Sequence, residues 1–217
     1  MKKTVIVFVL IIFLSVMAQA QNEEVFRHPL TAQTIPAFRA ACASLARHPN
    51  TRGRFEQEKI LSRLNRSLKS SGNFIIAVGS GMVWDTVSPF PSTLVLGADY
   101  LIQSRPGGQK TVLSAQGNEV FLSMAEVISA VFSGNARGLE NNFNIFYYTV
   151  SNSWEMGLIP QDRAINSFAQ RIIMKGDSVI KSIQITEQSG DSTIYILSNH
   201  NFPEALNADE RALFSLP

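Results

Sequence analysis

Residues 51–104 constrain the fold most strongly, because large apolar side chains recur at alternate positions through much of this stretch. Alternation with a period of two is typical of a β-strand that buries one face. The Gly cluster at 79–81 and the prolines at 89 and 91 separate the alternating runs, as turns separate antiparallel strands. We therefore predict a meander of short strands that directs one apolar face toward an interior.

An apolar segment near the start of the chain predicts export. Two lysines precede the apolar run 4–17, and an Ala-x-Ala sequence ends at Ala20. This order is typical of a cleaved secretory signal, whereas a membrane-spanning helix needs roughly 20 apolar residues. We expect cleavage after Ala20. Residues 1–20 would then be a signal peptide and residues 21–217 one soluble domain in the periplasm.

The charge and the cysteine content exclude several classes of protein. The formal net charge is +2, and two lysines belong to the signal segment, so the exported chain is nearly neutral. No basic tract indicates binding to nucleic acid. Cys42 is the only cysteine, so no internal disulfide is possible. Its apolar neighbours predict a buried thiol, and an intermolecular disulfide is the alternative.

Chemistry-bearing residues are sparse and do not form a catalytic or metal-binding pattern. His28, His48 and His200 are far apart in the sequence and fit no metal-ligand spacing. The sequence 79–81 lacks the full Gly-x-Ser-x-Gly elbow and precedes a strand, so we interpret it as a hairpin turn. We expect a binding protein with no cofactor and no metal, and not an enzyme.

The rest of the chain predicts further strands and a few helices. An amphipathic helix is expected over 35–47, with Thr34 as its cap and Pro36 in its first turn. Apolar spacing predicts a helix over 118–132, capped by Asn118 and ended by Gly134. The polar segment 135–142 is expected to be a short connection or a helical turn, and the tail 203–214 is expected to include an acidic helical segment. The expected strands are 52–60, 68–78, 82–86, 92–96, 100–104, 110–115, 143–150, 154–158, 168–174, 179–186 and 193–198.

The order of short motifs resembles the periplasmic outer-membrane lipoprotein carriers, the LolA-like family. An N-terminal helix is followed by Phe-x-Gln, Gly-x-Phe, a Trp and a Ser-x-Leu-Val strand. Each motif is weak alone, but together their order and spacing cover most of the exported chain. The matching residues are Phe55 and Gln57, Gly72 and Phe74, Trp84, Ser92–Val95, Trp154–Pro160 and Gly190–Thr193.

The resemblance implies an α+β, mainly β, fold: an incomplete, strongly curved antiparallel β-barrel with an α-helical lid that encloses a hydrophobic cavity. Strand parity and the apolar stripe of the long helix select the candidate lining, although ordinary core packing remains open for each residue. The candidates are Phe55, Phe74, Ile76, Val78, Met82, Trp84, Leu94, Leu96, Val120, Phe121, Met124, Val127, Ile128 and Val131.

One position departs from the family pattern. The resemblance implies that the related carriers have an Arg at the position of Val78 in this chain. In those carriers the Arg holds the lid closed over the empty cavity. A valine side chain cannot donate a hydrogen bond, so we expect a cavity that is softer or more persistently open, or a different ligand.

The resemblance implies a carrier that shields acyl chains of lipoproteins between the inner and outer membranes. Its partners would be the acylated ligand, an inner-membrane release complex and an outer-membrane acceptor, and it would act as a monomer. Two alternatives remain: a dedicated carrier of a glycolipid or another acylated or polyene compound, and a sensor or adaptor that uses the same fold to bind a protein.

Overall fold

The structure of the chain is a computed structural model that describes residues 24–114 and 119–215, except for the side chains of residues 119–121 and 124. The predicted signal segment and the predicted cap Asn118 lie outside the described residues. No helix in the described part of the chain is long and apolar enough to span a membrane.

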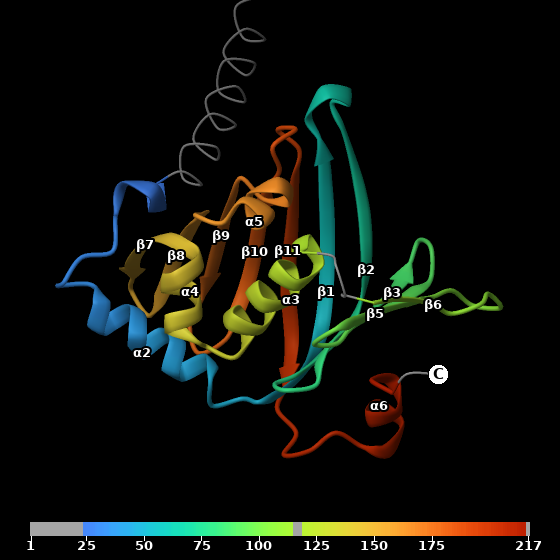
Figure 1. Cartoon of the computed structure of the whole chain (residues 1–217). Coiled ribbons are helices and arrows are strands. Elements are labelled where there is room, and N and C mark those ends of the chain that lie inside the picture. Colours follow the sequence, from blue (N-terminus) through green and yellow to red (C-terminus); the bar gives the residue numbers. More distant parts are fainter. Residues whose placement is uncertain (1–23, 115–118, 216–217) are drawn as a thin grey trace, which may run out of the picture.

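The described strands form one antiparallel sheet of 11 strands in the order β6-β5-β4-β3-β2-β1-β11-β10-β9-β8-β7. The order ends on β6 and β7, which do not pair, so the sheet curls without closing (Figure 1). The predicted incomplete antiparallel barrel is confirmed. The strands are β1 (Asn50–Leu61), β2 (Arg66–Ala77), β3 (Gly81–Ser88), β4 (Ser92–Leu96), β5 (Tyr100–Ser104), β6 (Thr111–Ser114), β7 (Phe143–Val150), β8 (Ser153–Pro160), β9 (Arg171–Gly176), β10 (Ile180–Thr186) and β11 (Ser192–Asn201).

Helices cover the concave side of this sheet. In Figure 1, α3 and α4 lie in front of the sheet and α2 runs along its lower left edge, while α6 lies apart from them near the carboxyl terminus. This arrangement gives the predicted helical layer over the curved sheet. The helices are η1 (Glu24–Arg27), α2 (Ile35–Leu45), η2 (Ser62–Leu64), α3 (Glu119–Phe132), α4 (Ala136–Asn142), α5 (Arg163–Phe168) and α6 (Ala208–Leu213).

The local predictions hold with two corrections. The expected strand over 168–174 is wrong at its start, because Phe168 ends helix α5 and strand β9 begins at Arg171. Asp162 caps α5 by accepting hydrogen bonds from two backbone amides, a capping signal that the sequence interpretation missed. Thr34 precedes α2, but its hydroxyl accepts from the Thr31 amide at 2.9 Å and makes no capping bond.

The two faces of the sheet bury separate apolar clusters. The larger cluster fills most of the concave side and includes Phe38 of α2 together with Phe55 and Phe74 of the sheet. A smaller cluster on the other face joins Val83, Val95 and Ile102 to Phe214 of the tail. The tail is fixed there by an ion pair between Arg52 and Glu210, in which Nε and Oε1 are 2.6 Å apart.

Candidate functional site

Most of the predicted lining residues whose side chains the structure describes lie in or against the buried cluster of the concave side. Seven belong to the larger buried cluster, and Trp84 and Ile128 pack against it at intermediate burial. Leu94 is half-buried, Val78 is 47% exposed, and the side chains of Val120, Phe121 and Met124 lie outside the described residues. The seven buried residues are Phe55, Phe74, Ile76, Met82, Leu96, Val127 and Val131.

Aromatic rings fill the centre of the hollow. The ring of Trp84 stacks on Phe55 with 4.0 Å between centroids and meets Tyr195 edge-on at 5.3 Å. Phe38 of α2 is fully buried and packs edge-on against Tyr147. This part of the interior is therefore a solid core, which fits ordinary strand packing of aromatics.

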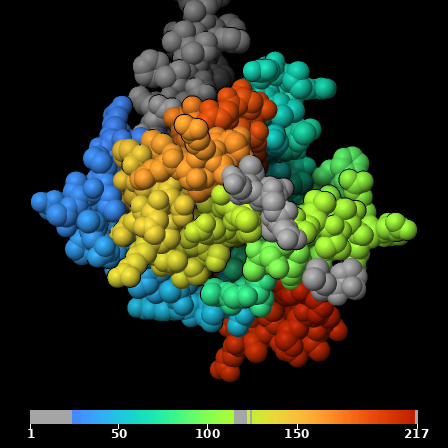
Figure 2. All heavy atoms as spheres, in the orientation of Figure 1, coloured from blue at the N-terminus to red at the C-terminus, as the bar shows by residue number. Residues whose placement is uncertain are grey.

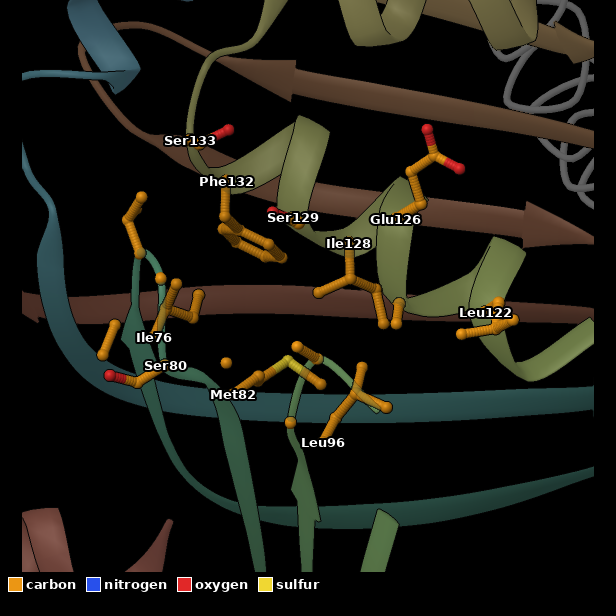
Figure 3. Close-up of a pocket in the computed structure, with 17 residues that line it drawn as sticks. Ile76, Ser80, Met82, Leu96, Leu122, Glu126, Ile128, Ser129, Phe132 and Ser133 are labelled. Carbon is orange, nitrogen blue, oxygen red and sulfur yellow. The ribbon is translucent and has the colours of Figure 1, made fainter. Parts of the chain in front are cut away.

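A pocket remains open on one side of this core, beneath α3. It lies between α3 and the turns that follow β2 and β4, and its volume is about 390 Å³. Ile128 and Phe132 point from α3 toward Ile76, Met82 and Leu96 of the sheet (Figure 3). The pocket is lined by residues 76–82, 96–98, Leu122, Ala125, Glu126, Ile128, Ser129, Phe132 and Ser133.

Five of the predicted lining residues border this pocket: Ile76, Val78, Met82, Leu96 and Ile128. The sequence interpretation missed Leu122, Ala125 and the turn residues. Helix α3 is apolar on two faces: Val127, Ala130 and Val131 enter the core, while Leu122, Ala125, Ile128 and Phe132 line the pocket. The sequence interpretation followed one apolar stripe along this helix. Mapping the apolar residues around the whole circumference of the helix could have found the second face.

The polar side chains of the pocket lie at its margin. In Figure 3 the carboxylate of Glu126 points away from the apolar side chains that face one another across the pocket. Val78 sits at the margin just after β2, where its amide donates to the Pro49 carbonyl at 2.8 Å. A valine at this position adds apolar surface to the mouth of the pocket.

A narrow second pocket of about 30 Å³ lies beside the first, and Phe132 lines both. His200 borders it and contacts the ring of Phe74 edge-on at 5.8 Å. Burial lowers the pKa of His200 below its ordinary value of 6.5. The ring of Phe202 stacks on His48 with 3.7 Å between centroids, and its centroid lies 6.4 Å from that of His200.

Burial makes two further groups, Cys42 and Tyr148, favour the neutral form. Burial, reinforced by the Glu140 carboxylate, raises the pKa of the Cys42 thiol to about 11, which fits the predicted buried cysteine. Burial also raises the pKa of Tyr148 to about 12, with Glu155 as the second cause. A thiol that stays protonated at neutral pH is a poor nucleophile, so burial leaves Cys42 unreactive.

Comparison with known structures finds similar folds at low identity. A LolA superfamily protein from Nitrosomonas europaea is 8% identical, with 86% of this chain and 98% of that chain covered and a TM-score of 0.46. A putative outer membrane lipoprotein-sorting protein domain from Vibrio parahaemolyticus is 13% identical, with 82% and 97% covered and a TM-score of 0.42. The MucA/MucB complex of Pseudomonas aeruginosa gives 13% identity, 83% and 61% coverage and a TM-score of 0.38.

Comparison with curated proteins gave no match. The family model described as outer membrane lipoprotein carrier protein LolA matches residues 49–214, which is most of the chain and contains all 11 strands. The predicted resemblance is therefore confirmed at the level of the family. The chain belongs to the LolA family of outer-membrane lipoprotein carrier proteins.

Proposed function

We propose that this protein is an exported carrier that holds the acyl chain of a lipoprotein, or of another acylated amphiphile, in the pocket beneath α3. The pocket itself is the observation that carries this proposal. Its facing side chains are apolar, it opens at one side, and its volume falls within the range of roughly 300–1,000 Å³ typical of small-molecule sites.

The size of the pocket matches one hydrocarbon chain. A cavity of about 150 Å³ holds a benzene ring of six carbons, so on the same scale a pocket of about 390 Å³ holds about 16 carbons. Burial contributes about 0.8 kcal/mol for each methylene group, so shielding such a chain from water is worth on the order of 10 kcal/mol. A single chain of this length therefore provides enough binding energy for a soluble carrier.

Release requires that the binding site not hold its ligand too rigidly. Met82 is unbranched and can adapt its shape to a flexible chain. Val78 offers no donor at the position where the related carriers have a latch, so we propose that α3 is not locked over the empty pocket. A ligand could then enter without first breaking a hydrogen bond.

The capacity for about one chain also supports a second candidate, a carrier of a single-chain amphiphile such as an acylated small molecule. Native mass spectrometry of the protein purified from the periplasm of its own cells distinguishes the two cargoes. A lipoprotein adduct supports the first candidate and a small amphiphile supports the second.

Displacement of a bound apolar dye tests the binding function itself. We expect palmitate and hexadecanol to displace bis-ANS at similar concentrations, because the shared 16-carbon chain supplies the binding energy. A protein that binds neither the dye nor the long-chain compounds would be better explained as an adaptor for a protein partner, and the carrier proposal would be wrong.

A further inference from the structure

Exposed apolar side chains gather on the part of the sheet farthest from the mouth of the pocket. Twelve large apolar residues are exposed in the described part of the chain, and six of them lie in the hairpin β1–β2, the end of β3 with its following loop, and the hairpin β5–β6. Isolated exposed residues are normal, but a gathering of this kind marks an interaction surface. The six are Leu64, Leu68, Val87, Phe90, Val112 and Leu113, of which Phe90 is 82% exposed.

The strand register brings these segments to one margin. Ser71 of β2 pairs with Ser88 at the end of β3, so residues 66–70 extend past β3 toward the hairpin tip. Thr93 of β4 pairs with Ser104 at the end of β5, which places the turn after β5 at the same end of the sheet. The teal and green atoms of these segments lie along the upper right margin of the molecule in Figure 2. We call residues 61–69, 87–91 and 105–113 the basic rim.

The basic rim carries cations that the described side chains do not neutralise, apart from Lys69. Arg63, Arg66, Arg105 and Lys110 are exposed and form no ion pair with another described residue. The three segments of the rim contain no Asp or Glu. Lys69, also in the rim, lies 3.8 Å from Glu58. Two acidic residues on the turn between β10 and β11 have partners other than the rim arginines. Glu187 pairs with Lys59 at 2.8 Å, and Asp191 accepts a hydrogen bond from the Ser62 amide at 2.9 Å.

The hairpin tip is held in place. The Ser62 hydroxyl donates to the Gly190 carbonyl at 2.5 Å, and the Ser62 amide donates to Asp191 on the same turn. The tip therefore presents Leu64 from a position that is fixed to the β10–β11 turn. Figure 1 shows this hairpin rising beyond the neighbouring strands.

Exposed apolar side chains flanked by unpaired cations are the combination that binds a membrane surface. Apolar groups insert at the boundary between headgroups and acyl chains, and Lys or Arg side chains are attracted to anionic lipids. We propose that the basic rim docks this protein on an anionic phospholipid bilayer, with Leu64, Leu68 and Phe90 entering the interface. This docking concerns a surface separate from the pocket and does not depend on the proposed carrier function.

Vesicle sedimentation tests the proposal with a chain that begins at Gln21, which contains every described residue. Vesicles of phosphatidylcholine alone are compared with an equal mixture of phosphatidylcholine and phosphatidylglycerol. We expect at least tenfold stronger partition into the anionic vesicles, and a loss of most of this difference when sodium chloride rises from about 0.1 M to about 0.5 M, because salt screens exposed charges. Equal partition into both vesicles would overturn the proposal.

Paired variants assign the surface. Leu64→Ser with Phe90→Ser should lower partition by about tenfold or more, because two apolar side chains no longer enter the interface. Arg63→Gln with Arg66→Gln should lower binding to anionic vesicles only. The matched controls are Val150→Ser and Arg47→Gln, exposed at the opposite end of the strands. The proposal is overturned if the controls lower binding as much as the rim variants.

Two further measurements separate docking from folding and from ligand binding. Thermal unfolding of each variant should match the parent, since all the substituted side chains are exposed. Binding of bis-ANS in the absence of vesicles should also be unchanged, because the rim does not line the pocket. Failure of dye binding in every protein would contradict the carrier function and leave the vesicle result intact.

Discussion

Phe55 of β1 lies directly opposite Gly72 of β2, so that a large ring faces a residue without a side chain. A Cβ on Gly72 would lie 2.9 Å from Cε1 of Phe55 and would clash with the Asp85 carbonyl on β3. Two residues along the ladder, on the same face, Phe74 lies opposite Gly53. Gly72 therefore leaves room for the ring of Phe55, and Gly53 leaves room for the ring of Phe74. The Phe-x-Gln and Gly-x-Phe motifs thus pack against each other across β1 and β2.

Gly72→Ala should destabilise the protein by about 2–3 kcal/mol, because the added methyl group meets backbone atoms that cannot move without disturbing the β2–β3 ladder. Urea unfolding measures this change. Gly108→Ala is the control, since its Cβ would lie at ordinary distances of 3.4 Å or more from other atoms. Equal stability of the two variants would show that the close approach of β2 and β3 is not needed.

Ala125→Trp should block the pocket, because residue 125 lines it from α3 and the indole would occupy the space assigned to the acyl chain. We expect the affinity for palmitate to fall by at least tenfold with little change in stability. Ala212→Trp places the same side chain on an exposed position of α6 and should leave affinity unchanged. Unaltered binding in Ala125→Trp would move the ligand site elsewhere.

Phe132→Ala should join the two pockets, since this side chain lines both. We expect the preferred chain length of the ligand to increase, and the protein to lose about 2–3 kcal/mol of stability because a partly buried ring is removed. A displacement series with fatty acids of increasing length reads out the first effect. The same optimum length in the parent and the variant would show that the narrow pocket is not accessible to ligand.

Val78→Arg should restore a donor at the mouth of the pocket, within the region bordered by Glu126, Ser129 and Ser133. We expect association of an apolar ligand to slow several-fold, measured by stopped-flow fluorescence, because α3 would be held over the empty pocket. Val78→Gln provides a polar control without charge. If both the rate and the affinity stay at parent values, residue 78 has no latching role.

Stability should fall as the pH drops from 7.5 to 5.5, with His200 as one cause. Burial lowers the pKa of His200 in the folded chain, whereas in the unfolded chain the ordinary value of 6.5 applies. The unfolded chain therefore binds more protons as the pH falls through that value, and the equilibrium shifts toward unfolding. Urea unfolding at both pH values measures the decrease, and His200→Gln should reduce it. An unchanged decrease in this variant would show that His200 is not a cause.

Much of the fold follows from local sequence signals. The alternation of apolar residues assigns strands and their inward faces, because side chains of a strand alternate between its two sides whatever the strand pairs with. Phe74 and Ile76 accordingly face the concave side, and both are buried. The end of α3 at Gly134 was also predictable: its φ of +63° is a conformation that glycine adopts without strain.

Other features depend on side-chain hydrogen bonds that the pattern of apolar residues does not report. Residues 163–168 form a short helix that Asp162 caps. The alternating pattern that begins at Phe168 instead favours a strand, so the sequence placed the start of that strand too early. Thr34 could have capped α2, but its hydroxyl bonds to Thr31 instead.

The sequence by itself determined which residues share one face of a strand, since that depends only on the period of the backbone. It could not determine which of those residues border empty space. Phe55 and Ile76 share the concave face, yet Phe55 is covered by Trp84 while Ile76 borders the pocket. The difference arises because α3 and the turn at 78–81, distant in the chain, approach without filling the volume between them, and only the tertiary structure sets that distance.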